Sequence, residues 1–103
     1  MYSVVLCTCK DEDEARKISM DILNEKLAAC VNIVPKINSI YWWKGKLVKE
    51  NECLMIIKTK RTLFEKLFNR IKSIHSYSVS EIVELSVGKS NPDYLSWILE
   101  VTK

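Results

Sequence analysis

The feature that most constrains this chain is the stretch Ala28 to Lys60, which reads as one long β-hairpin. Two runs rich in β-branched and aromatic residues flank a tip with the sequence Trp43-Lys44-Gly45-Lys46. Gly45 is one of only two glycines, and a tight turn needs a residue that tolerates positive φ. The first arm, about 15 residues at ~3.3 Å each, would reach about 50 Å. A compact chain of this length is only about 35 Å across, so we expect the tip to project from the domain.

Both faces of this predicted hairpin are apolar. Trp42 and Trp43 are adjacent, and neighbours in a strand point to opposite faces. A single layer of helices covers only one face, and burying a large apolar side chain is worth about 1.5–3 kcal/mol. An exposed apolar patch of this size is typical of an interaction site, although Trp43 could instead be a solvated tip residue. We therefore predict a subunit interface that includes Trp42, Trp43, Met55 and Ile56.

Length and composition predict one globular domain over residues 1–103, with 48% apolar and 28% charged residues. The net charge of +3 is mild and requires neither nucleic acid nor a membrane as partner. The first ten residues are apolar but lack a basic region, so they predict a strand and not a signal peptide. We expect a cytoplasmic protein with reduced thiols. No Cys-x-x-Cys pair occurs among Cys7, Cys9, Cys30 and Cys53, which argues against structural zinc.

Hydrophobic periodicity predicts further elements on both sides of the hairpin. They are a strand Ser3–Cys9, a helix ending near Lys26, a helix from Thr62 to about Ile74, a strand Glu81–Val87 and a helix Pro92–Val101. This β-α-β-β-α-β-α order predicts an α+β fold, a ferredoxin-like βαββαβ sandwich with an extended hairpin and a C-terminal helix. Such a sheet carries its helices on one face, so the other face is free to bind a second subunit.

Local signals predict two capped helix starts and one strand irregularity. Asp11 with Glu14, and Thr62 with Glu65, have the spacing of capping boxes. The acidic run at the first of these starts is interpreted as a solvated helix end and not as a cation site. Pro35 predicts an edge strand or a β-bulge. The hydrophobic alternation changes phase near Asn38-Ser39, as a bulge would cause.

Several segments resemble a known family. They are KLAACVNIVPKINSIYWWKGKL, Glu52–Thr59, the loop around His75-x-Tyr77 and DYLSWI near the end. Together they resemble the CutA family of divalent-cation-tolerance proteins over nearly the whole chain. The resemblance implies a tight homotrimer in which hairpin strands extend sheets between subunits, similar in architecture to the PII signalling proteins. Some bacterial members are linked to copper tolerance and bind divalent copper, and animal members are linked to anchoring acetylcholinesterase. No enzymatic activity is implied.

The resemblance places copper ligands on Cys7 and His75. A thiolate and an imidazole form a soft ligand set that suits copper. Two ligands do not complete a site, so Glu81, a backbone group, water or a neighbouring subunit would have to contribute. The alternatives are that Cys7 is a buried small hydrophobe and that His75 is a cation at a helix end. No cofactor is required, and copper or another divalent ion would bind weakly.

The loop after the second helix departs from the family pattern H-P-Y-x-x-P-E. Ser76 and Ser80 stand where prolines are usual, so two constraints on φ are missing and we expect a more mobile loop. A PII-like trimer would place Lys58, Tyr77 and Glu81 near small-molecule clefts between subunits. Alternatively, Lys58 and Glu81 form an ordinary ion pair.

Other classes of protein are less well supported. With only Gly45 and Gly88, the chain has no glycine-rich phosphate loop, and no nucleophile–base pairing is recognisable. A set of basic residues could contact RNA, but the aromatic RNA-binding pattern is missing. We therefore predict a non-enzymatic, homotrimeric, copper-binding protein of metal tolerance, without nucleic-acid or membrane partners. The alternative is a non-catalytic, PII-like scaffold that binds a small molecule or a protein partner between subunits.

Overall fold

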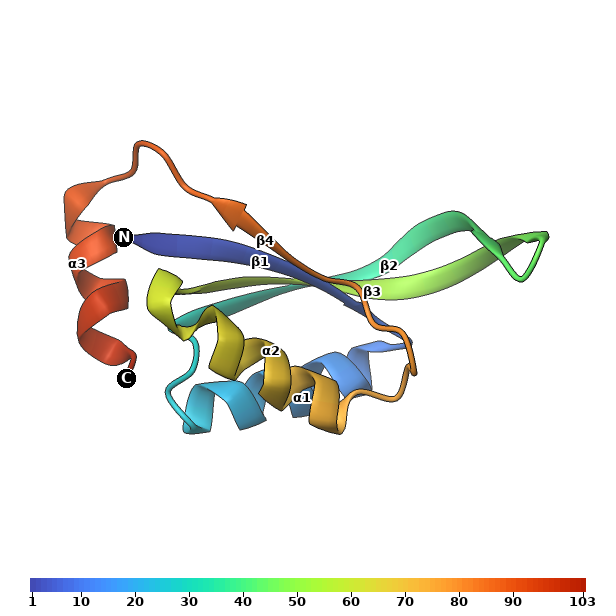
Figure 1. Ribbon diagram of the computed structural model, residues 1–103, viewed down its shortest axis with the longest axis horizontal. Coiled ribbons are helices and arrows are strands. Elements are labelled where there is room, and N and C mark those ends of the chain that lie inside the picture. Colours follow the sequence, from blue (N-terminus) through green and yellow to red (C-terminus); the bar gives the residue numbers. More distant parts are fainter.

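The computed structural model describes residues 1–103 (Figure 1). Its elements are β1 (Tyr2–Cys9), α1 (Glu12–Asn24), β2 (Cys30–Trp43), β3 (Lys46–Lys60), α2 (Phe64–Ile74), β4 (Ile82–Ser86) and α3 (Pro92–Val101). A short 3-10 turn, Arg61–Leu63, joins β3 to α2. The predicted order of elements is confirmed, and β4 is one residue shorter at each end than expected.

The four strands form one antiparallel sheet in the order β2-β3-β1-β4. The helices α1 and α2 lie side by side on one face of the sheet, while α3 lies against its end, beside the start of β1 (Figure 1). This is the ferredoxin-like topology that the sequence predicts, with the C-terminal helix as an addition. Most of the second face of the sheet has no helix over it.

The hydrophobic core lies between the sheet and the helices α1 and α2. Residues that are fully buried there include Val5, Cys7, Ile18, Met55, Ile57, Leu67 and Ile71. On the uncovered face, Leu6 pairs with both Ile56 and Val83, and Val4 pairs with Leu85. Val83 and Leu85 remain 44% and 45% exposed, so an apolar stripe crosses three strands without cover from this chain.

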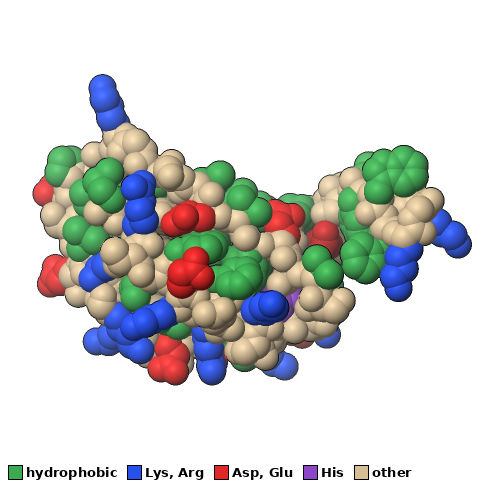
Figure 2. Space-filling view, in the orientation of Figure 1, with side chains coloured by type: hydrophobic (Ala, Val, Ile, Leu, Met, Phe, Trp, Pro, Cys, Tyr) green, Lys and Arg blue, Asp and Glu red, His purple; other side chains and the backbone are tan.

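The hairpin of β2 and β3 projects beyond the helices, as expected (Figure 1). The molecule measures 44 Å along its longest axis and 26 and 22 Å along the others. Lys44 and Gly45 form the tip with φ values of 50° and 77°, the positive pair that a tight hairpin turn requires. Trp42 is 73% exposed and Trp43 45% exposed. Hydrophobic side chains gather at this end of the molecule together with lysines (Figure 2).

A β-bulge in β2 changes which side chains share a face. The pairing with β3 is irregular between Val34 and Ile37, where Pro35 and Lys36 together stand opposite the single residue Cys53, so β2 has one extra residue here. β2 is an edge strand and the bulge lies at Pro35, which confirms what Pro35 predicts, while the change in alternation begins slightly before Asn38-Ser39. Beyond the bulge the alternation of β2 is reversed relative to β3. This reversal brings the face of β2 that carries Tyr41 and Trp43 onto the same side as Glu50 and Glu52.

The two predicted capping boxes have different outcomes. The carboxylate of Asp11 accepts a hydrogen bond of 2.9 Å from the N–H of Glu14, which confirms Asp11 as the cap of α1. The side chain of Glu14 accepts from the N–H of Lys10 and not from that of Asp11, so the reciprocal half of the box is absent. This helix ends at Asn24, and Lys26 then takes a left-handed conformation with φ of 56°. The cap predicted at Thr62 is wrong, because Thr62 lies in the 3-10 turn and no side chain caps α2.

Candidate functional site

A cleft of about 690 Å³ lies between the hairpin and the loop that joins α2 to β4. The hairpin contributes residues from both β2 and β3, and the loop contributes Tyr77 to Val79 and Glu81. The side chains that give the cleft its chemical character are Tyr41, Trp43, Glu50, Glu52, Tyr77 and Glu81. The bulge in β2 makes this lining possible, because it sets aromatic residues of β2 on the same face as acidic residues of β3.

His75 anchors the loop to the end of β1. Its Nε2 lies 2.8 Å from the carbonyl oxygen of Thr8, and its Nδ1 lies 3.0 Å from the backbone N–H of Tyr77. Because Nδ1 accepts a hydrogen bond from that N–H, the ring proton belongs on Nε2, which donates to Thr8. Both nitrogens of His75 are therefore engaged within the chain. The rings of His75 and Tyr77 also pack with centroids 4.9 Å apart.

Cys7 lies on the covered face of β1 and is fully buried. Its Sγ is 3.7 Å from the same Thr8 carbonyl oxygen that accepts from His75. Burial, reinforced by the neighbouring Cys9, raises the pKa of the Cys7 thiol to about 12. The structure thus brings the two predicted ligands together, but as a thiol and a fully hydrogen-bonded imidazole. No group of three or more His, Cys, Asp or Glu side chains is arranged to hold a metal ion.

Tyr77 reaches across the cleft to β3. Its hydroxyl donates a hydrogen bond of 2.7 Å to Glu52, a carboxylate that is only 8% exposed. Burial and this carboxylate raise the pKa of Tyr77, so the hydroxyl stays protonated. Sequence reasoning identified Tyr77 but missed Glu52. The available signal was an acid directly before the apolar run Cys53–Ile57.

Glu14 holds the loop from the other side. One carboxylate oxygen accepts from the backbone N–H of Ser76 at 2.8 Å, and the other accepts from that of Lys10 at 3.2 Å. Burial acts to raise the pKa of Glu14, but the hydrogen bonds from Ser76 and Lys10 outweigh it and hold the pKa below its usual value. The interpretation of the whole acidic run as solvated is thus wrong for Glu14, which is buried. Ser76 supplies an N–H that the proline usual at this position would lack.

Two predicted site residues lie elsewhere. Lys58 is far from the cleft lining and donates to the side chain of Asn32 on β2. It makes no ion pair with Glu81 within the chain, so that alternative is wrong, whereas a place near a cleft between subunits stays a prediction. The register explains this, because Lys58 pairs with Val4 near the start of β1, whereas Glu81 immediately precedes the β4 residue that pairs with Cys7.

The predicted interface residues divide between the two faces of the sheet. Met55 points into the core, is 0% exposed and contacts Ser19 of α1. It offers no surface to a second chain, which corrects that expectation. Ile56 lies on the uncovered face, and Trp42 and Trp43 lie on the projecting hairpin. These three side chains remain available to a partner.

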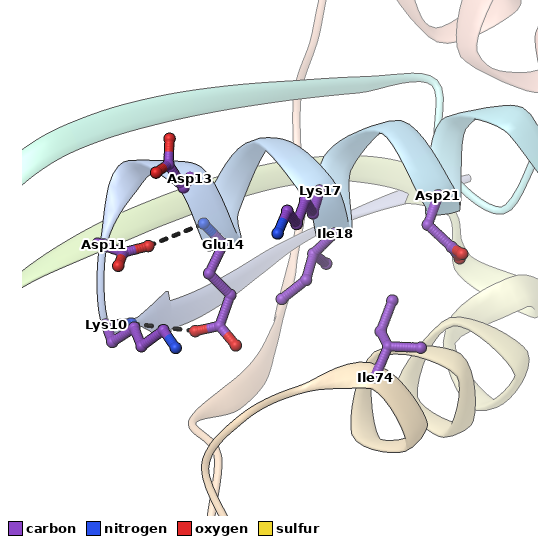
Figure 3. A pocket seen from close by; sticks show the side chains of 8 residues that line it. All are labelled: Lys10, Asp11, Asp13, Glu14, Lys17, Ile18, Asp21 and Ile74. Carbon is purple, nitrogen blue, oxygen red and sulfur yellow. Dashed lines mark hydrogen bonds between the residues drawn. The ribbon is translucent and has the colours of Figure 1, made fainter.

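A second hollow, of about 520 Å³, lies beside α1 and Ile74 of α2 (Figure 3). Three of its four acidic side chains already have partners, and the fourth, Asp13, is exposed. The carboxylate of Asp11 caps α1, and both oxygens of Glu14 accept backbone hydrogen bonds. Arg70 donates to both oxygens of Asp21 at 2.7 and 2.6 Å, which lowers the pKa of Asp21. We therefore assign the functional site to the cleft beside the hairpin.

The fold and the cleft define an α+β protein of ferredoxin-like topology with a projecting hairpin. The chain belongs to the CutA1 divalent ion tolerance protein family, whose model matches residues 3–101. The divalent-cation tolerance protein CutA of Thermus thermophilus is 46% identical over 99% of both chains. Protein CutA of Mus musculus is 43% identical, and the chain spans 57% of its length. The family comprises non-enzymatic tolerance proteins.

Solved structures show the same fold. The divalent cation tolerance protein of Thermus thermophilus superposes with a TM-score of 0.97 at 46% identity, and each chain is covered completely. CutA of Archaeoglobus fulgidus, described as periplasmic, gives a TM-score of 0.97 at 34% identity, again over both whole chains. A rice relative, 41% identical, is described as chloroplastic. None of the helices in this chain has the length and apolar character needed to cross a membrane.

Proposed function

We propose that this protein is a homotrimeric, cytoplasmic, divalent-cation-binding protein of metal tolerance that takes up copper at the junction of Cys7 and His75. The observation that carries the proposal is the convergence of the Cys7 thiol and the His75 imidazole on the Thr8 carbonyl. Family membership and the names of its relatives support the link to divalent cations. Four free cysteines are consistent with a reducing compartment.

Copper would have to displace groups that are already bound. His75 accepts from Tyr77 at Nδ1, so a metal at that nitrogen must break this hydrogen bond. A metal at Cys7 must remove a proton from a thiol whose pKa is raised to about 12. Both requirements weaken the binding of copper. Because the thiol must release its proton when the metal binds, the affinity for copper should increase as pH rises. The proposed site is therefore a weak one that opens to admit its ion.

The direct experiment is calorimetric titration of copper(II) into the wild type and His75→Ala under argon. A thiol count before and after would show that no cysteine is oxidised. We expect binding to weaken about tenfold or more, a loss of at least about 1.4 kcal/mol, in His75→Ala. Asn69→Ala, an exposed change on α2, serves as the matched control and should bind like the wild type. Equal, weak binding in all three proteins would remove copper from this site.

A second candidate function is a non-catalytic, PII-like scaffold that binds a small molecule in clefts between subunits. The cleft beside the hairpin is lined by a single chain, and its volume of about 690 Å³, which is within the usual range for ligand pockets, supports the binding of a small molecule there. Native mass spectrometry of the purified assembly would detect a retained ligand. A trimer that carries no ligand, and whose copper affinity depends on His75, would favour the first function over the second.

A further inference from the structure

The cleft combines acidic and aromatic side chains without a basic one. Three carboxylates and three aromatic rings line it, and neither lysine nor arginine does so, although the chain carries a net charge of +3. Carboxylates attract cations, and the faces of aromatic rings do so as well. The rings also provide apolar surface for an alkyl chain. This lining fits a cation that has an apolar body, and it repels phosphates and carboxylates.

Glu52 is the buried anchor of this lining. One of its oxygens accepts from the hydroxyl of Tyr77, and the other has no partner within the chain. Every fully buried side-chain oxygen or nitrogen has a hydrogen-bond partner. The second oxygen of Glu52 has none, so this oxygen is not fully buried. Because Glu52 lines the cleft and is only 8% exposed, that oxygen opens into the cleft. It is a charged acceptor in need of a donor.

The arrangement suits an organic cation better than a metal ion. Divalent metals take several oxygen ligands at once, and no suitable group of three His, Cys, Asp or Glu side chains exists here. The cleft volume of about 690 Å³ is also much larger than a bare ion needs. An ammonium group needs only hydrogen-bond acceptors and a negative field. Its alkyl chain would pack on Tyr41 and Trp43, which are on the same wall.

We infer that this cleft binds an alkylammonium group, with Glu52 as its ion-pair partner and the rings of Tyr41 and Trp43 around its alkyl chain. The inference deepens the scaffold function by naming the class of its ligand, and it does not depend on copper at His75. Two sources could supply the group. One is a free small amine, and the other is a lysine at the hairpin tip of a second copy, where Lys44 and Lys46 are exposed.

The test is a titration of 1,5-diaminopentane into the purified assembly, in which binding is measured by calorimetry and by tryptophan fluorescence. We expect saturable binding that weakens about tenfold or more in Glu52→Gln. The glutamine keeps an oxygen that can accept from Tyr77, so the variant should stay folded. Glu65→Gln makes the same charge change on the exposed side of α2 and should bind like the wild type. Pentan-1-ol, which has an alkyl chain without a charge, should not bind.

Three results would overturn the inference: no saturable binding, equal affinity in Glu52→Gln and the wild type, or equal affinity for pentan-1-ol. A retained ligand that is neutral or anionic would also overturn it, while leaving the scaffold function in place. The double variant Lys44→Ala/Lys46→Ala separates the two sources. Unchanged diamine affinity supports a free amine, whereas a gain of about tenfold supports a lysine from a second copy as the natural occupant.

Discussion

The carboxylate of Glu14 accepts a hydrogen bond of 2.8 Å from the backbone N–H of Ser76, 62 positions later in the chain. This contact joins the start of α1 to the loop that forms one wall of the cleft. Glu14→Gln keeps one acceptor oxygen but loses the charge and the second acceptor. Hydrogen bonds to charged groups are worth about 1.5–3 kcal/mol, so we expect a loss of that order in the free energy of unfolding. Urea denaturation at a fixed protein concentration measures it.

The same contact predicts a pH dependence. The pKa of Glu14 is lower in the folded protein, so its contribution to stability is complete above the unfolded pKa of about 4.3 and is lost as pH falls through the folded pKa. The wild type should therefore lose more stability between about pH 5 and 3 than Glu14→Gln does. Asp13→Asn, an exposed change in the same turn, is the control. Parallel acid losses in the wild type and Glu14→Gln would contradict the prediction.

The four cysteines should differ strongly in reactivity. Cys7 and Cys9 are fully buried, and burial raises the pKa of each thiol to about 12. Burial likewise raises the pKa of Cys53, whereas Cys30 is only partly buried. At about pH 8 a thiol with such a pKa is alkylated roughly 10³-fold more slowly than an ordinary one, because the thiolate is the nucleophile.

Mass spectrometry after timed treatment with iodoacetamide would follow this difference residue by residue. Cys30 should be modified first and nearly alone. All four cysteines should react at similar rates in guanidinium chloride, which serves as the control. Early labelling of Cys7 in the folded protein would show that its surroundings open readily, and would contradict its assignment as a sealed thiol.

How well each part of this molecule could be predicted depends on how far apart in the sequence the interacting residues lie. The hairpin, its tip at Gly45 and the cap at Asp11 follow from residues close together in the sequence, and the structure confirms them. The bulge expected at Pro35 is confirmed too, although the change in alternation was read a few residues later, near Asn38-Ser39. A change in alternation becomes visible only after the irregularity that causes it.

The contacts around the cleft had no comparable local signal. Glu52 meets Tyr77 across 25 positions, and only the completed fold brings them together. The ion pair considered for Lys58 with Glu81 and the interface role expected for Met55 were wrong for a related reason. Alternation shows that both faces of a strand are apolar, but not which face the helices cover or which end of the sheet lies near the loop. Met55 lies on the covered face, and Lys58 pairs with Val4 near the start of β1, away from Glu81.

The two glycines of the chain form a matched pair of test positions. Gly45 has a φ of 77°, whereas Gly88 has no positive φ, and a Cβ at either position would meet no atom within 4 Å. Any difference between them is therefore one of backbone conformation. Gly45→Ala should cost about 1–2 kcal/mol, because a side chain disfavours the left-handed region. Gly88→Ala should be neutral or should stabilise the fold by up to about 1 kcal/mol, because alanine lowers the conformational entropy of the unfolded chain. Thermal unfolding of both variants tests this, and equal effects would contradict it.

The apolar stripe on the uncovered face predicts how subunits assemble. Ile56 lies on this stripe beside Leu6, and Trp43 extends the apolar surface onto the hairpin. A carboxylate at Ile56 would be buried without a partner in a trimer, which is strongly unfavourable. Ile56→Asp should therefore dissociate the trimer in sedimentation velocity runs. It should also lower the stability of the protein, since folding and assembly are coupled.

Met20→Asp is the matched control for this prediction. Met20 is 59% exposed on α1, the helix layer that covers the opposite face of the sheet, so a charge there should leave assembly unchanged. An intact trimer in Ile56→Asp would show that the stripe is not the contact. A wild-type chain that sediments as a well-folded monomer at low micromolar concentration would remove the trimer itself. In a monomer, Val83, Leu85 and Trp42 would stay exposed to water, and the free energy that their burial contributes would be lost, because no element of the same chain covers them.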